Sequence, residues 1–481
     1  MARFIGRKTE LKKLQKFSEK KIASFIVIMG RRRIGKSRLI AEFSKSFSHH
    51  YFFIGLPPDK DVTAQHQLDE FSRQMARALN TAYARYEDWS DALWALGEKL
   101  KSGKILLVFD EISWMGSKDP TFLGKIKNFW DLYLKNNDQL IFIVCGSASS
   151  WIKKNLLSST GFVGRISYNL TLKELPLLEC NQFWPPNISP YEKFKILAIT
   201  GGIPRYLEEI DPKVGAEENI KNLCFTKGAL LARDFENIFS DLFLTDSLFY
   251  KKIVEVLATG AKEREEICES LGIAPSGRIS GYLQELKLAG FVTRDYTWNI
   301  DTSTNSKLSK YRLSDNYLRF YLKYIQKNLD KINQDEDGFH FSSLGSLPEW
   351  HTTLGLQFEN LVLNNRKLIR EALNINPGEV IWDNPFFQRK QAHIPGCQID
   401  YLIQTKFNTL YIFEIKFSKN KIDSSILDQM QKKINALKHI KGFSFRPVLI
   451  HVNGVSEEVI ESGFFSSIID FSKFLDPDKL K

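Results

Sequence analysis

Short apolar runs separated by helical patterns dominate the first third of the chain. Three of these runs are rich in β-branched and aromatic residues and are long enough to form buried strands. They are Phe25–Met29, Ile105–Phe109 and Leu140–Val144. A helical pattern follows the first run at Arg38–Phe43. Strands that alternate with helices predict an α/β domain built on a parallel sheet.

The pattern between residues 249 and 325 is mainly helical. Three helical segments broken at short turns are expected at Tyr250–Ala258, Glu263–Leu271 and Ser276–Ala289. Short apolar pairs then bracket a polar stretch, Asn299–Lys310, which predicts a hairpin with a long loop. This is the order of a winged helix-turn-helix. Its candidate recognition helix presents Ser276, Arg278, Ser280, Tyr282 and Gln284. Direct DNA contact and a protein-docking role both stay open.

A third pattern begins beyond Gly355. An amphipathic helix is expected from Leu356, followed by two alternating strands, Gln398–Ile403 and Leu410–Lys416. A short turn joins these strands, so they predict a hairpin. Glu414 and Lys416 are two residues apart and therefore face the same side of the second strand.

Composition and charge narrow the class of protein. The chain has 481 residues, 43% of them hydrophobic and 26% charged, which is typical of about three globular domains. Residues 1–50 contain fourteen Lys or Arg and three Glu, and these account for the whole net charge of +11. The basicity therefore surrounds one loop and is weak evidence for nucleic acid. The five scattered cysteines and the lack of a signal-peptide pattern or long apolar stretch favour a reduced cytoplasm over a membrane.

The loop after the first apolar run reads Gly30-Arg31-Arg32-Arg33-Ile34-Gly35-Lys36-Ser37. This is GxxxxGK[ST] between a strand and a helix, the context that a phosphate loop requires. Glycines let backbone N–H groups wrap phosphates at a helix N-terminus. Lys36 would neutralise the β- and γ-phosphates, and Ser37 would offer its hydroxyl to Mg²⁺.

The second and third apolar runs end in polar residues that suit catalysis. Asp110 and Glu111 follow the second run, where one carboxylate can hold Mg²⁺ through water and the other can polarise the attacking water. Ser147 follows the third run and would point at the nucleotide.

The C-terminal hairpin also carries candidate chemistry. Asp400 follows an apolar strand position, and Glu414 and Lys416 share one face of the next strand. Such carboxylates can hold Mg²⁺, while the lysine stabilises an attacking water and the charge of the transition state. An ordinary hairpin with solvated charges is the alternative.

At these residues the chain resembles the bacterial and archaeal AAA-type ATPases related to the initiator and STAND classes. Phe4–Leu11 is similar to their hhGRxxEL box, Asp110-Glu111 to their second Walker element and Ser147 to their sensor position. The resemblance implies that Arg7 lies near the adenine and the lid. The residues expected to bind ATP or its Mg²⁺ are Arg7, Gly30, Arg31, Arg32, Arg33, Ile34, Gly35, Lys36, Ser37, Arg38, Asp110, Ser147 and Pro204.

Two further assignments follow from this resemblance. Gly164-Arg165-Ile166 is similar to the stretch that carries an arginine finger, so Arg165 would reach the γ-phosphate of a neighbouring subunit; a surface arginine is the alternative. Gly201–Leu207 resembles the Gly-x-Pro element of a STAND-like lid, with Pro204 near the nucleotide. The lid lacks a clear sensor arginine, which favours a slow nucleotide switch, and a plain helix start at Pro204 is the alternative.

The C-terminal segment resembles the PD-(D/E)xK restriction-endonuclease-like fold. Asp400, Glu414 and Lys416 match its motif one by one, and Glu359 matches its helix carboxylate. The resemblance implies a Mg²⁺ site at Glu359, Asp400 and Glu414, with Gln429 as a further polar residue of the site. Intact catalysis and an eroded site both stay open.

The expected architecture is an α/β phosphate-loop core (1–170), a helical lid (171–245), a winged helix-turn-helix with a linker helix (246–325) and a nuclease-like domain (326–481). The leading hypothesis is an ATP-hydrolysing protein that acts on DNA, as a homo-oligomer, with metal-dependent cleavage left open. One alternative is a STAND-like signalling scaffold whose winged helix and inert tail bind protein. Another is a DNA-binding regulator with an inert nuclease-like domain.

Overall fold

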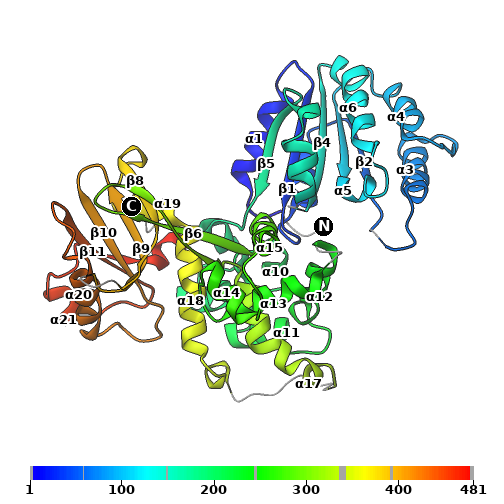
Figure 1. The fold of residues 1–481 in the computed structure, drawn as a ribbon. Helices are drawn as coiled ribbons and strands as arrows, with labels where there is room; N and C mark the ends of the chain where they lie inside the picture. Colours follow the sequence, from blue (N-terminus) through cyan, green and yellow to red (C-terminus); the bar gives the residue numbers. More distant parts are fainter. Residues whose placement is uncertain are drawn as a thin grey trace. The chain divides into compact units, whose positions relative to one another are not determined.

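The computed structural model describes residues 4–57, 59–147, 150–242, 246–334, 343–390 and 394–476 (Figure 1). The chain forms two compact units. The first holds most of the chain up to Leu175, and the second holds most of the chain from Pro176 onward.

The first unit contains a five-stranded sheet in which every neighbouring pair is parallel. The strands are β1 (Ser24–Gly30), β2 (His49–Ile54), β3 (Ile105–Asp110), β4 (Leu140–Ser147) and β5 (Ile166–Leu172). Their order is β2-β3-β4-β1-β5. The three apolar runs are therefore its three central strands, and their carboxyl ends lie at one edge of the sheet. The register pairs Gly30 with Ser147, so the phosphate loop begins beside the end of β4.

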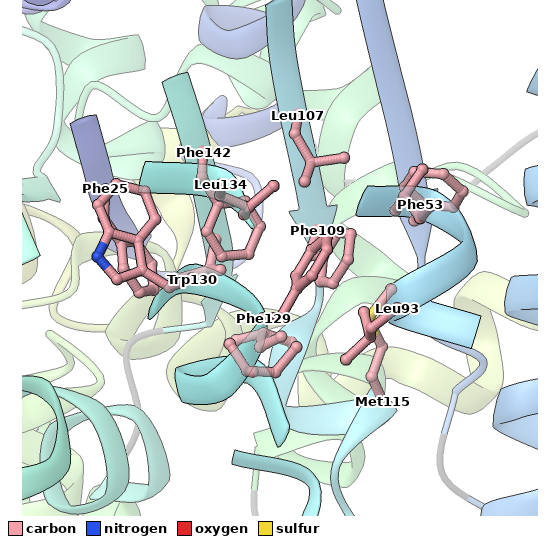
Figure 2. Packing of buried hydrophobic residues seen from close by; sticks show 14 of the residues in the cluster. Phe25, Phe53, Leu93, Leu107, Phe109, Met115, Phe129, Trp130, Leu134 and Phe142 are labelled. Atoms are coloured by element: carbon pink, nitrogen blue, oxygen red, sulfur yellow. The ribbon is translucent and has the colours of Figure 1, made fainter. Parts of the chain in front are cut away.

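Helices cover this sheet and close its core. They are α1 (Lys8–Ser18), α2 (Lys36–Ser44), α3 (Ala64–Leu79), α4 (Trp89–Gly97), α5 (Ile112–Met115), α6 (Phe122–Leu132) and α7 (Ser150–Ile152). Figure 2 shows the core cluster, in which aromatic side chains of the central strands meet those of α6. Phe109 packs edge-on against Phe142 with ring centroids 5.1 Å apart. This packing fixes β3 and β4, which end at Asp110 and Ser147.

The second unit begins with helices and continues into two sheets. Its helices are α8 (Leu177–Cys180), α9 (Pro190–Thr200), α10 (Pro204–Leu207), α11 (Ala216–Cys224), α12 (Leu230–Leu242), α13 (Ser247–Ala258), α14 (Arg264–Ser270), α15 (Gly277–Leu288), α16 (Asn316–Phe320), α17 (Leu329–Gln334), α18 (Trp350–Asn364), α19 (Arg366–Ala372), α20 (Ser425–Leu437) and α21 (Glu457–Glu461). Across the described residues, every helix is too short or too polar to cross a membrane.

The two sheets of this unit are a hairpin and a five-stranded mixed sheet. The hairpin pairs β6 (Val292–Asn299) with β7 (Thr304–Leu313). The larger sheet has the order β12-β11-β10-β9-β8 and contains β8 (Val380–Gln388), β9 (Cys397–Thr405), β10 (Thr409–Ile415), β11 (Ser444–His451) and β12 (Ser467–Asp470). Strands β8, β9 and β10 are antiparallel, whereas β11 and β12 run parallel to β10.

The hairpin differs from the one expected. Most of the polar stretch Asn299–Lys310 is part of strand β7, and only residues 300–303 turn the chain. The prediction of a long loop was wrong because this strand is polar where one of its sides faces solvent. The end of the hairpin is buried against the larger sheet: Trp298 stacks on Trp382 at 5.6 Å, and its indole N–H donates to Gln404 Oε1 at 2.5 Å.

Candidate nucleotide site and carboxylate cluster

The phosphate loop is shaped by residues with left-handed backbone conformations. Gly35 has φ of 89° and stands at the N-cap of α2, and Arg33 has φ of 68°. Lys36 is buried, and its ammonium donates to the carbonyl oxygens of Gly30 at 3.0 Å and Arg31 at 3.4 Å. The lysine thus lies across the loop, at the positive end of a nine-residue helix, where an anionic phosphate would be favoured.

Ser37 and Asp110 meet beside the loop. The Ser37 hydroxyl donates to Asp110 Oδ2 at 2.9 Å. The end of the phosphate loop and the acidic pair after β3 therefore lie together, as expected from the sequence. A hydroxyl and a carboxylate oxygen in contact are hard oxygen ligands of the kind that Mg²⁺ prefers. The residues present therefore fit the ion, and the roles of Ser37 and Asp110 as its protein ligands stay a prediction.

Cys145 is a residue of this site that the sequence analysis missed. Its thiol donates to Asp110 Oδ1 at 2.6 Å, while the backbone N–H of Glu111 donates to the same oxygen at 3.0 Å. Burial raises the pKa of the Cys145 thiol, so it stays a protonated donor. The signal in the sequence was the position of Cys145 near the end of the third apolar run, because the ends of neighbouring parallel strands meet.

Glu111 has the features of a catalytic base. It follows β3 in a left-handed conformation with φ of 52°, and within the described residues its Oε2 atom accepts no hydrogen bond. Burial raises the pKa of this carboxyl, while the nearby Lys36 charge opposes the rise. The backbone of Ser147 also interacts with Glu111, which brings the expected sensor position to the same edge. A buried carboxylate with one open oxygen can accept a proton from a positioned water.

The arginines around the loop have structural partners. Arg7 is buried and donates to the carbonyl oxygens of Ile34 at 2.9 Å and Lys173 at 2.5 Å. It therefore braces the phosphate loop, and its expected position near the adenine stays a prediction. Arg31 lies 3.9 Å from Glu174. The side chains of Arg32, Arg33 and Arg38 are partly exposed.

Arg165 is held by an ion pair with Asp131, and Pro204 belongs to the second unit. The Arg165 guanidinium makes a two-pronged pair with Asp131, with the shortest N–O distance at 2.8 Å, and it lowers the pKa of that carboxyl. This is the geometry of an intrachain ion pair, and a role as an arginine finger stays a prediction. Pro204 is buried in the second unit at the first position of α10.

The three motif residues of the C-terminal hairpin come together with a fourth side chain. Asp400 is on β9, Glu414 is on β10 and Lys416 follows β10. Lys416 Nζ lies 2.8 Å from Glu414 Oε1. Lys433 of α20 reaches both acids, with its Nζ 2.6 Å from Glu414 Oε2 and 3.1 Å from Asp400 Oδ1.

The fourth side chain is Lys433, and the expected polar residue on this helix, Gln429, is exposed. Lys433 was missed although its spacing held a signal. It falls on the stripe formed by Ile426, Met430 and Leu437, which are buried. A lysine on the buried stripe of an amphipathic helix indicates a buried acidic partner.

Glu359 lies on α18 near this cluster. Burial and the Asp400 charge raise the pKa of Glu359 to about 7. Among the described residues, however, no group of three or more His, Cys, Asp or Glu side chains is arranged to hold a metal ion. The Lys433 ammonium already lies between Asp400 and Glu414, where the resemblance implies Mg²⁺, so these residues do not fit Mg²⁺ as they stand.

The candidate recognition helix, α15, presents its polar side chains to two different surroundings. Arg278 pairs with Asp246 at 3.0 Å and donates to Tyr282 at 2.6 Å, and Tyr282 itself is buried. Tyr282 is therefore unavailable to a DNA groove. Ser280 and Gln284 instead line a pocket of about 1050 Å³ that is also lined by the β6–β7 hairpin, β8, the start of α14 and residues that follow α20.

Comparisons with known proteins support part of this interpretation. Residues 4–210 match the model of a family described as an ATPase domain predominantly from Archaea. The chain is 28% identical over 366 residues to an uncharacterized protein of Methanocaldococcus jannaschii. The aligned region covers 74% of this chain and 76% of that protein. The family match and the geometry of the phosphate loop agree that the first 210 residues contain an ATP-binding ATPase domain.

The solved structures to which the chain is similar include two archaeal proteins. The Walker-type ATPase of Pyrococcus abyssi has a TM-score of 0.45 and 16% identity, with 66% of this chain and 96% of that chain covered. The Aeropyrum pernix ORC2 protein, solved as ADPNP–ADP complexes, has a TM-score of 0.44 and 13% identity, with coverage of 69% and 96%.

Proposed function

We propose that this chain binds and hydrolyses ATP with Mg²⁺ and uses the nucleotide to control its action on DNA. The observation that carries the proposal is the contact of Ser37 with Asp110 beside the buried Lys36, with Glu111 next to it. Lys36 would leave the loop carbonyls to bind the β- and γ-phosphates, and Glu111 would take the proton of the attacking water. Bound Mg²⁺ would neutralise phosphate charge.

The first test of this proposal is ATP binding. Lys36→Ala is expected to weaken ATP binding about 100-fold or more, because it removes a charged donor from a buried phosphate site. Titration with a fluorescent ATP analogue measures this change. Lys45→Ala is the matched control, since Lys45 follows the same helix and is exposed. Equal affinities of the Lys36 variant and the parent chain would exclude this loop as the nucleotide site.

The DNA part of the proposal is supported by the order of helices and hairpin in the second unit and by the resemblance of the C-terminal segment to nuclease-like domains. Arg278 is the side chain of α15 best suited to meet a phosphate, since it is 72% exposed. Its partner Asp246 is also at the surface, and such surface pairs are weak enough for a phosphate to replace them.

Arg278→Glu is accordingly expected to weaken DNA binding and to reduce the slope of log affinity against log salt by about one phosphate contact or more. Fluorescence anisotropy with labelled DNA at several salt concentrations measures both quantities. Lys287→Glu makes the same charge change at the other end of α15 and serves as the control. Unchanged affinity of the Arg278→Glu chain would make the winged helix a spacer, and equal weakening by both variants would exclude Arg278 as the specific contact.

A second candidate function is a nucleotide switch whose C-terminal domain binds its partner, DNA or protein, without cutting it. The specific observation that favours it is the double ion pair of Lys433 with Asp400 and Glu414. In this version the domain keeps the fold of a nuclease while its acidic residues serve packing and charge balance. The partner is then held by the second unit and released by the nucleotide cycle.

Assembly into a homo-oligomer through Arg165 would first have to break the ion pair of Arg165 with Asp131.

A further inference from the structure

The acidic cluster of the C-terminal sheet is already balanced by protein groups. Lys433 Nζ contacts one oxygen of each acid, at 3.1 Å from Asp400 and 2.6 Å from Glu414. The remaining Asp400 oxygen accepts the backbone N–H of Ile415 at 3.1 Å. The remaining Glu414 oxygen forms an ion pair with Lys416 Nζ at 2.8 Å. Two carboxylates thus meet two ammonium groups, and Glu414 Oε2 makes its ion pair with Lys433 without a hydrogen bond.

The position of Lys433 is fixed by packing as well as by charge. It lies on α20, whose neighbouring side chains Met430 and Leu437 are buried in the core of the same sheet. The ammonium therefore reaches the acids from a helix that the core holds in place, and 20% of the side chain remains exposed. Glu414 is almost completely buried, so its charge depends on such a partner.

A divalent cation between Asp400 and Glu414 would have to take the place that Lys433 Nζ occupies. If the ammonium stayed, ion and lysine would bring three positive charges against two carboxylates, with Lys416 adding a fourth. In a partly dry site that repulsion is costly. If the ammonium left, the Lys433 side chain would have to adopt another rotamer that places the ammonium in solvent.

We infer that Lys433 is the resident counter-ion of this cluster, so that the C-terminal domain takes no divalent cation between Asp400 and Glu414, and that removing its ammonium converts the cluster into a divalent-cation site. The inference is independent of the proposed ATP chemistry, because it rests on the second unit alone.

The test uses Mn²⁺ as the probe and the full chain carrying Asp110→Asn, which removes the ligand of the nucleotide site. Calorimetric titration gives the stoichiometry, and thermal melting with and without Mn²⁺ gives an independent readout. Lys433→Met removes the charge at similar volume. Lys432→Met is the control, since Lys432 is the exposed neighbour on α20. Asp400→Asn added to either chain removes one proposed ligand.

The expected result is that the Asp110→Asn background chain binds the same amount of Mn²⁺ with and without Asp400→Asn. Lys433→Met should gain one equivalent, bound at least tenfold more tightly than by the background chain, with a rise in melting temperature that Asp400→Asn abolishes. A stoichiometric Mn²⁺ site in the background chain, lost with Asp400→Asn, would overturn the inference. So would a folded Lys433→Met chain that gains no Mn²⁺. If Lys433→Met does not fold, the background titration still decides, and Lys433→Arg should fold and exclude Mn²⁺ as the parent does.

Discussion

Glu111→Gln is expected to lower ATP turnover by about 10²- to 10⁴-fold while ATP binding stays within a few-fold of the parent. The amide has almost the shape of the carboxylate but cannot accept the proton of the attacking water. Lys36 and the Ser37–Asp110 pair are unchanged in this variant, so ATP affinity should survive. Phosphate release under saturating ATP and Mg²⁺, beside a nucleotide titration, separates the two effects.

The matched control for this variant is Glu98→Gln. Glu98 is a more exposed glutamate of the same unit, paired with Lys101 at the end of α4. It should turn ATP over at the parent rate. Parent-like turnover in Glu111→Gln would show that another group activates the water, and the assignment of the base would be wrong.

Asp295→Ala is expected to destabilise the second unit by about 3–5 kcal/mol, because it leaves a buried guanidinium without its carboxylate. Arg312 Nε lies 2.7 Å from Asp295 Oδ2, and both side chains are buried. The same guanidinium also donates to Asn360 of α18, so the pair joins the hairpin to the helix that carries Glu359. Urea unfolding followed by tryptophan fluorescence gives the change in free energy.

Asp301→Ala is the control for this prediction. Asp301 is exposed in the turn of the same hairpin, so its loss should change the free energy of unfolding by less than about 0.5 kcal/mol. Equal effects of the two substitutions would mean that the Asp295–Arg312 pair contributes no more than a surface charge.

The phosphate loop and the carboxylates beside it could be predicted from sequence because their determinants are local. A phosphate loop needs a strand, two glycines, a lysine and a helix within a few residues, and a catalytic acid needs only the end of an apolar run. The structure brings Ser37 to Asp110 across 73 positions of sequence because β1 and β3 both flank β4 in a parallel sheet. The brace made by Arg7 was not predictable, since its acceptors are backbone carbonyls of Ile34 and Lys173 and backbone acceptors leave no residue signature.

The C-terminal cluster shows where the motif falls short. The hairpin and its acids are predictable from alternation and spacing, yet the partner that determines their charge comes from α20, 33 residues beyond Asp400. Nothing in an Asp…Glu-x-Lys pattern says which cation balances it. The β6–β7 hairpin was predicted with too long a loop for a different reason: the polar residues of β7 form a strand with one side facing solvent, and such a strand resembles a loop in sequence.

The burial of the hairpin end constrains how this chain can have been assembled in evolution. Trp298 and Ile300 share one core with β8, β9 and β10, and Gln404 binds both the Trp298 indole and the carbonyl of Ile300. A recombination event that joined the C-terminal sheet to a different helical segment would lose these partners at once and expose tryptophans on both pieces. Relatives are therefore expected to contain the helices from α13 onward and the C-terminal sheet together. The sequence of the hairpin is expected to vary less between relatives than the rest of these parts.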